Sequence, residues 1–119
     1  MQQLPIHVVA GLVLTPLLIS AGQILFKRAS EHAGAPDLSG LVPLLLNPYL
    51  ITALVIYGVG TIVWVYVLKT VPLITAYPFM ALTFCAVPAL AWLFLGETLT
   101  LRYALGTGLI IAGVLIVNS

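Results

Sequence analysis

Few residues in this chain could carry out chemistry, and nearly all of them lie outside its long apolar stretches. The charged residues are Lys27, Arg28, Glu31, Asp37, Lys69, Glu97 and Arg102. Neither His7 nor His32 has carboxylate or cysteine neighbours at the spacing of known metal-binding motifs. No serine, histidine and aspartate form a convincing hydrolytic triad. We therefore predict no metal site, no cofactor and no enzymatic activity.

Charge is absent from the middle of every long apolar stretch. Ionisable residues inside a membrane usually mark a proton or ion pathway. Their absence argues against a proton relay at the membrane centre, so a transported solute would have to be contacted by uncharged polar groups and by cations near the membrane surfaces.

The candidates for contacting a substrate are polar, aromatic or basic residues in or beside these stretches. Gln23 is hard to explain as packing, because an amide in lipid is costly without a partner. It also lies one helical turn before Lys27. The full set is Gln23, Lys27, Arg28, Tyr57, Trp64, Lys69 and Tyr77. Alternatively, Lys27 and Arg28 serve only topology and contact with anionic lipid. We expect serine and threonine hydroxyls here to bond their own helix backbone.

The elements that must position these residues are membrane-spanning helices. Of 119 residues, 62% are hydrophobic and 6% are charged, whereas a soluble domain carries about 25% charged residues. About 20 apolar residues cross a bilayer as a helix, and suitable stretches lie at 6–26, 49–68, 73–95 and 103–117. We predict an all-α integral membrane protein with four transmembrane helices in one domain, 1–119. The net charge of +1 argues against nucleic-acid binding.

The connections between these stretches are polar and short. Residues 27–47 form an aqueous loop in which Leu41–Leu46 is a candidate interfacial helix, ended by Asn47–Pro48. The first stretch has no basic start and is too long for a signal peptide, so we expect a span there. The distribution of lysine and arginine places the first and third loops in the cytoplasm and both termini outside.

Prolines and small residues mark two helices for special roles. Pro78 and Pro88 flank Thr83 within the third stretch, and each proline removes a helix hydrogen bond. We predict that this helix is the element that bends between two access states.

In the fourth stretch, Ala104, Gly108 and Ala112 recur every four residues, a pattern that lets another helix approach closely. We predict that this stripe is a dimer interface; the alternative is that it packs only against other spans of its own chain.

Three segments together carry a resemblance to a known family: "AGQILFKRAS", "VPLITAYPFMALTF" and "FLGETLTLRYALGTGLIIAGVLIV". The chain resembles the drug/metabolite transporter superfamily over nearly its whole length, and more closely the four-helix, small multidrug resistance-like (EamA-like) members. This resemblance implies a multi-pass protein of the inner membrane that acts as a dimer.

Two patterns within that group differ at the first helix. Proton-coupled exporters carry a glutamate three residues before a glycine, and aligning that glycine with Gly22 places Ile19 at the acid's position. The chain is more similar, at Ser20–Gln23 and Val71–Pro78, to the paired small subunits that flip aminoarabinose-linked undecaprenyl phosphate. The resemblance therefore implies translocation of a polyprenyl-phosphate-linked sugar or a related amphiphile.

The resulting hypothesis is a flippase subunit with a partner of similar size, either a second copy or a similar four-helix chain. Gln23, Tyr57, Trp64 and Tyr77 would shelter the headgroup, and the cations would hold its phosphate. One alternative is a drug or small-cation exporter that uses Glu97. Against it, Glu97 lies at a helix end, where an ion pair with Arg102 is the simpler expectation. A second alternative is a non-transporting subunit that packs against a larger membrane enzyme.

Overall fold

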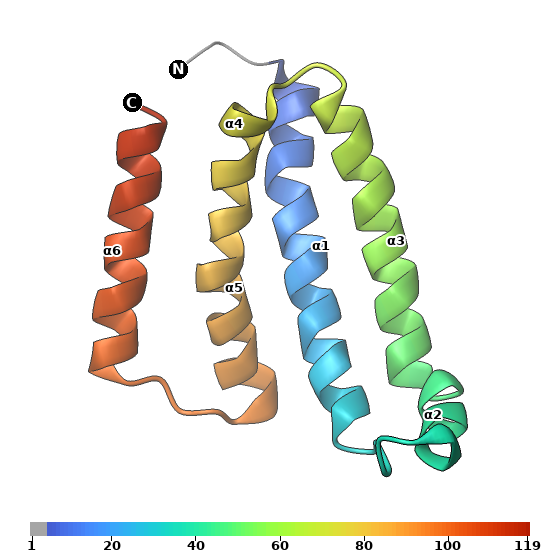
Figure 1. Ribbon diagram of the computed structural model, residues 1–119. Coiled ribbons are helices and arrows are strands. Elements are labelled where there is room, and N and C mark those ends of the chain that lie inside the picture. The colour runs from blue at the N-terminus through green and yellow to red at the C-terminus, as the bar shows by residue number, and fades with distance from the viewer. Residues whose placement is uncertain (1–4) are drawn as a thin grey trace.

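The described part of the chain, residues 5–119 of a computed structural model, is built from helices, with no strand in that range (Figure 1). The α-helices are α1 (Ile6–Ser30), α2 (Leu38–Leu45), α3 (Pro48–Leu68), α4 (Leu73–Ala76), α5 (Thr83–Leu90) and α6 (Leu101–Val117). A 3₁₀ segment, η1 (Tyr77–Leu82), joins α4 to α5, and a π-helical segment, η2 (Ala91–Leu95), follows α5. The all-α prediction is confirmed.

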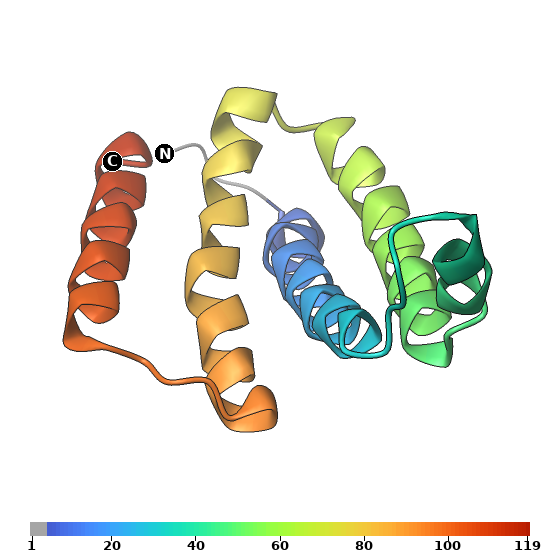
Figure 2. The same ribbon diagram turned by 60° about the horizontal axis from the view of Figure 1, so that its bottom comes forward.

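The long helices stand side by side in an open row, in the order α6, third span, α1, α3 (Figures 1 and 2). The third span is the continuous run of α4, η1, α5 and η2, over Leu73–Leu95. α1 packs on α3 along one side and on α5 and η1 along the other, while α6 contacts η1. Because α3 and α6 form the two edges of the row, the chain does not enclose a path by itself.

Within residues 5–119, three helices are long and apolar enough to cross a membrane: α1, α3 and the third span. α6 is also apolar but has 17 residues. It begins at Leu101 because the Thr100 hydroxyl oxygen accepts a hydrogen bond from the Tyr103 backbone N–H at 3.1 Å. Whether α6 crosses as a fourth span stays a prediction.

The tightest packing in the molecule joins α1 to α3, and small residues make it possible. Ala53, Gly60 and Val67 follow one another at intervals of seven along α3, and all are buried against α1. A Cβ on Gly60 would lie 3.7 Å from the Leu18 Cβ, and a Cβ on Gly22 would lie 3.7 Å from the Tyr57 ring. Since lipid provides no hydrophobic force between helices, this close fit is what holds the pair together.

The third span departs from regular α-helix on both sides of α5. Pro78 lies at the start of η1, and Pro88 lies within α5 shortly before η2. A proline removes a backbone donor and crowds the preceding turn, which favours such local rewinding. The predicted irregularity of this span is therefore present, and its role in bending stays a prediction.

α6 packs loosely against the rest of the chain. None of its residues is buried, and a Cβ added at Gly106, Gly108 or Gly113 would meet no atom within 4 Å. The predicted small-residue stripe, Ala104, Gly108 and Ala112, is exposed along its length. Ala104 and Gly108 line a hollow whose opposite wall includes Cys85 and Pro88 of the third span, so the stripe faces that span without close packing.

Candidate functional site

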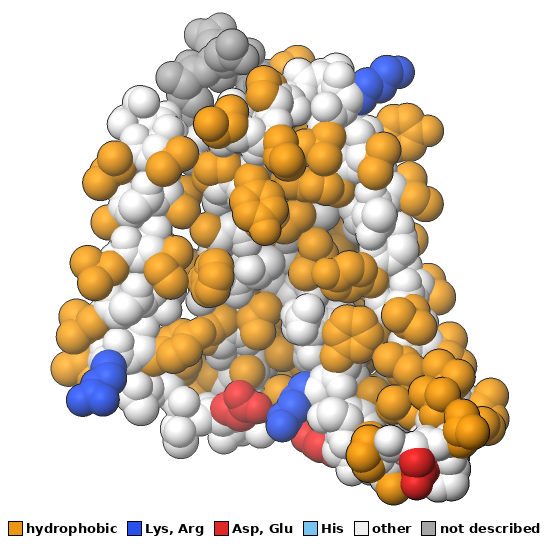
Figure 3. Space-filling view, in the orientation of Figure 1, with side chains coloured by type: hydrophobic (Ala, Val, Ile, Leu, Met, Phe, Trp, Pro, Cys, Tyr) orange, Lys and Arg blue, Asp and Glu red, His pale blue; other side chains and the backbone are white. Residues whose placement is uncertain are grey.

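Charged side chains lie at the ends of the row, most of them at one end, and the face between the ends that Figure 3 shows is largely apolar. The end of α1, the start of α2 and the start of α6 share one end of the molecule, which we call the loop end (Figure 1). Lys27 and Arg28 lie in the last turn of α1, and Glu31 and Asp37 follow in the connection to α2. Glu97 precedes α6, and Arg102 lies in its first turn. Lys69 follows α3 at the opposite end.

At the loop end, the Arg28 side chain links the end of α1 to the end of η2. Its Nη2 donates to the Phe94 carbonyl oxygen at 2.6 Å, and its Nη1 lies 3.9 Å from the Glu31 Oε2. Phe94 is in the last turn of η2, where carbonyls have no partner within the helix. The chain then reverses at Gly96, whose φ of 69° lies in the left-handed region that favours glycine. A cation is also favourable at a helix carboxyl end.

Lys27 occupies the same helical turn but is left free. Its side chain is exposed and makes no hydrogen bond or ion pair within residues 5–119. Glu97 and Arg102 also do not form the ion pair that we considered from the sequence; the Arg28–Glu31 contact is the one ion pair in the described chain. Of the two adjacent cations on α1, Lys27 is therefore the one available to an anion.

Gln23 and Tyr57 lie toward the loop end on the paired helices α1 and α3. Gln23 is exposed, one turn before Lys27. The Tyr57 side chain is 37% exposed, and its ring centroid lies 6.0 Å from that of Phe26. Both residues could contact a solute outside the row, and neither lines a cavity within the chain.

Trp64 and Tyr77 lie toward the opposite end. Trp64 packs, partly buried, against a core cluster that includes Leu12, Val67 and Ala76. Tyr77 is 64% exposed and faces a groove between the third span and α6. The predicted substrate residues thus form two groups at different ends, and no single cavity in the described chain joins them.

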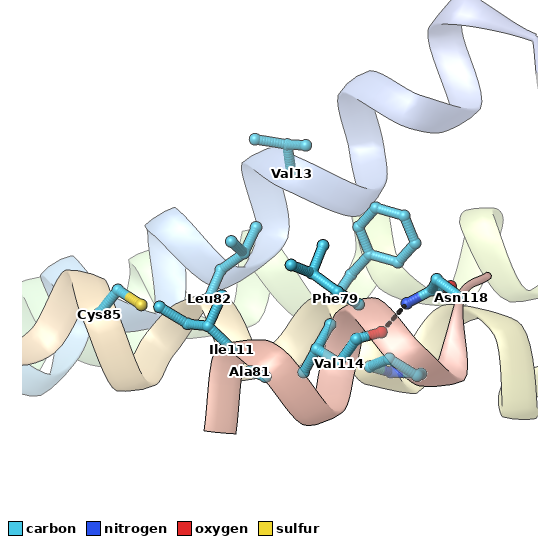
Figure 4. A pocket seen from close by; sticks show the side chains of 10 residues that line it. Val13, Phe79, Ala81, Leu82, Cys85, Ile111, Val114 and Asn118 are labelled. Carbon is cyan, nitrogen blue, oxygen red and sulfur yellow. Dashed lines mark hydrogen bonds between the residues drawn. The ribbon is translucent and has the colours of Figure 1, made fainter. Parts of the chain in front are cut away.

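Several apolar hollows separate α6 from the third span. One of about 290 Å³ lies between Pro88 and the Ala104–Gly108 part of the stripe, and two others adjoin Pro78. The first of these two, of about 440 Å³, is lined by Val13, Phe79, Leu82, Cys85 and Ile111 among others, with Asn118 at one end (Figure 4). The Asn118 amide donates to the Val114 carbonyl at 3.0 Å. The second, of about 900 Å³, is more open and includes Leu73, Tyr77 and Ile110. Pro78 lines both of these hollows.

Sequence reasoning singled out Tyr77 and Pro78 but not the other residues that line these two hollows, because an apolar side chain beside a gap has no signature of its own. A proline inside a predicted span, Pro78, was the sequence signal that pointed to this region.

The expectation for hydroxyls is confirmed. Thr15 and Ser20, both fully buried, donate to the Gly11 and Pro16 carbonyls at 2.8 and 2.7 Å. Thr83 likewise donates to the Met80 carbonyl at 2.7 Å.

Ile19 is the residue that, from the sequence, we align with the acid of proton-coupled exporters. Its Cγ1 lies 4.0 Å from the point that a Cβ on Gly60 would take, so Ile19 faces α3. Within residues 5–119, no group of three histidine, cysteine, aspartate or glutamate side chains lies at metal-binding distance. The centre of the row therefore presents hydrocarbon and helix-bonded hydroxyls.

Comparison with known proteins gives a consistent result over nearly the whole chain. A family model described as the EamA-like transporter family matches residues 7–119. A protein of Erwinia tasmaniensis is 42% identical over 109 residues, which cover 91% of this chain and 94% of that protein. A protein of Yersinia pseudotuberculosis is 36% identical over 107 residues, 90% of this chain and 92% of that protein.

Both relatives are named "Probable 4-amino-4-deoxy-L-arabinose-phosphoundecaprenol flippase subunit ArnE". A Yersinia pestis protein of the same name is 35% identical over 107 residues, with 90% of this chain and 92% of that protein covered. No solved structure matches the chain.

Proposed function

Because the chain belongs to the EamA-like transporter family, we propose that it is one subunit of a flippase for a polyprenyl-phosphate-linked sugar. The protein is a multi-pass membrane transporter of the inner membrane. Its substrate class rests on one main observation: relatives up to 42% identical over 91% of the chain are named as flippase subunits for an aminoarabinose-linked phosphoundecaprenol. We name the class and leave the sugar open.

The distribution of charge supports an amphiphilic anion as the substrate. Lys27 offers a free ammonium at the loop end, while Arg28 is held by Phe94 and Glu31. Between the two ends, the row carries no charge that would trap a phosphate at the membrane centre. The lipid tail of the substrate can stay in the bilayer, so only the headgroup needs protein contacts during transfer.

A second subunit completes the path in this proposal. The open row leaves Gln23, Tyr57 and Tyr77 exposed, and an exposed amide in lipid is costly unless a partner or a substrate covers it. In this proposal Gln23 and Tyr57 contact the headgroup toward the loop end, and Tyr77 contacts it toward the opposite end. Trp64 contributes mainly by packing against the core cluster.

The partner would be either a second copy or a similar four-helix chain that packs on α6. The exposed stripe of Ala104, Gly108 and Ala112 permits close helix contact. If the two subunits are inserted in opposite directions, each membrane face carries Lys27 of one subunit and Lys69 of the other. Inverted repeats of this kind are common in transporters.

The third span is the moving element in this account. It contains both prolines, Pro78 and Pro88, and changes its winding on each side of α5. Because Pro78 lines two of the hollows next to α6, a change in bend at this residue would open one of them and close the other.

Drug or small-cation export is less well supported. It needs an acid on the path, and Ile19 is apolar at the position where that acid would stand. Glu97 lies after η2, outside the helices, at the loop end.

A proteoliposome assay tests the proposal. The chain and its partner subunit are reconstituted with a polyprenyl-phosphate-linked sugar that carries a fluorescent headgroup. Movement between leaflets is followed by loss or gain of quenching by a membrane-impermeant reagent. Transfer faster than in protein-free vesicles supports the proposal, and transfer at the protein-free rate contradicts it.

A further inference from the structure

The short helix α2 exposes apolar side chains although it lies in the most polar connection of the chain. Leu38 is 80% exposed, Val42 58% and Leu45 53%. These residues are spaced i, i+4 and i+7, so they lie on one face of the helix. Gly40, on the other side, is buried against the preceding loop. α2 therefore has one face toward the protein and an apolar face toward its surroundings.

The position of α2 is fixed relative to a membrane-spanning helix. Only Leu46 and Asn47 separate it from α3, which begins at Pro48. At 1.5 Å per residue, the 21 residues of α3 span about 31 Å, close to the bilayer's hydrocarbon thickness of about 30 Å. Pro48 thus lies at the edge of the hydrocarbon, and Tyr49 is an exposed aromatic at the same level.

The amino end of α2 is built to remain in contact with water. The Asp37 carboxylate accepts a hydrogen bond from the Gly40 backbone N–H at 3.1 Å, and the Ser39 hydroxyl donates to the same oxygen. The Ser39 and Gly40 hydrogen bonds hold the pKa of Asp37 below its ordinary value, so the carboxylate stays charged. Lys27 and Arg28, in the last turn of α1, mark the same charged end.

The loop before α2 holds the helix in a defined place. A Cβ at Gly40 would collide with the Ala35 carbonyl oxygen, which shows that the loop backbone lies directly on the helix. α2 also contacts α3. The exposed face of Leu38, Val42 and Leu45 is therefore a surface held in a fixed place beside the start of α3.

We propose that α2 lies in the membrane interface, with Leu38, Val42 and Leu45 in the outer part of the acyl region and Asp37 among the headgroups. The occupant of this apolar face is the lipid bilayer itself. A charged start, an apolar face and a location at the hydrocarbon edge are the features of helices that lie in the interface plane. The proposal depends on the membrane location of the protein and not on the identity of its substrate.

Site-directed spin labelling of the full chain in lipid vesicles tests this placement. Cys85 is replaced by serine, and single cysteines are then introduced as Val42→Cys and, in a separate protein, Leu45→Cys. Collision with oxygen, which concentrates in the acyl region, is compared with collision with a water-soluble nickel chelate. Glu31→Cys serves as the aqueous reference, and Val55→Cys, 62% exposed on α3, serves as the lipid reference.

We expect the ratio of oxygen to nickel accessibility at positions 42 and 45 to lie between the two references and above that of Ser39→Cys. Ratios equal to that of Glu31→Cys would overturn the proposal, because α2 would then be in water. Low accessibility to both reagents would also overturn it, since a protein surface would then cover the helix. Each labelled protein is used only if its thermal unfolding matches that of the Cys85→Ser parent, and the two positions give independent readings.

Discussion

The Arg28 guanidinium and the Phe94 carbonyl oxygen, 66 residues apart in the chain, form a hydrogen bond of 2.6 Å. This contact joins the end of α1 to the end of the third span on the side where the charged residues gather. It gives Arg28 a structural partner, while the adjacent Lys27 remains free. Lys27 and Arg28 are adjacent basic residues that the sequence alone does not distinguish, yet only the Arg28 side chain has a hydrogen-bond partner in the described chain.

We predict that Arg28→Ala destabilises the protein more than Lys27→Ala does. The hydrogen bond involves a charged donor, but the Arg28 side chain is 41% exposed, so solvent screening limits the loss to about 1 kcal/mol. Thermal unfolding in detergent measures the difference. Equal unfolding temperatures for the two variants would show that the Phe94 contact contributes no net stability.

The α1–α3 pair depends on the absence of a side chain at Gly60. We predict that Gly60→Leu destabilises the pair by about 1–3 kcal/mol, the usual cost of overpacking, because the Leu18 Cβ lies 3.7 Å from the new Cβ. Gly58→Leu is the matched control on the same helix, since a Cβ there meets nothing within 4 Å. Unfolding of both variants in the same detergent gives the comparison, and a similar loss in both would argue against this interface.

Much of the fold follows from the sequence, and the failures have physical reasons. Hydropathy placed the helices well: α3 runs over Pro48–Leu68 where 49–68 was predicted. α1 extends past the predicted Phe26 to Ser30, because Lys27 and Arg28 suit a helix carboxyl end. The Arg28–Phe94 contact was not predictable, since no local pattern relates residues in two different spans.

Some features of the candidate site were also predictable from the sequence, and others were not. The free cation Lys27 and the exposed amide Gln23 were identified by residue type and spacing. Their separation from Trp64 and Tyr77 was not foreseen, because it depends on which helices are neighbours in the open row. The hollows beside Pro78 likewise arise from the loose packing of α6.

The stripe on α6 provides a test of the partner subunit. We predict that Gly108→Leu reduces co-purification with the partner severalfold and leaves the unfolding temperature of the chain alone unchanged, because a Cβ at Gly108 meets nothing within 4 Å. Gly106→Leu, on the opposite side of α6, has equally open surroundings and should keep the partner. Loss of the partner in Gly106→Leu alone would place the interface on the other face.

The alternative function, cation export, would require the carboxylate of Glu97 and can be tested by replacing that residue. We predict that expression of the chain gives no resistance to quaternary ammonium compounds and that Glu97→Gln changes neither growth nor transport. The reason is that Glu97 lies outside the helices and makes no ion pair in the described chain. Minimum inhibitory concentrations measure this. Resistance that disappears in Glu97→Gln would favour the exporter.

The most direct test of the whole account is the initial rate of headgroup transfer in vesicles that contain the chain and its partner. We predict a wild-type rate well above that of protein-free vesicles. Lys27→Ala should lower this rate about 10-fold, the effect of losing one charge-assisted hydrogen bond of about 1.4 kcal/mol, and Lys27→Arg should restore most of it. Expression and unfolding temperature should stay at wild-type values in both variants. A wild-type rate equal to the protein-free rate, with both subunits present and folded, would contradict the account.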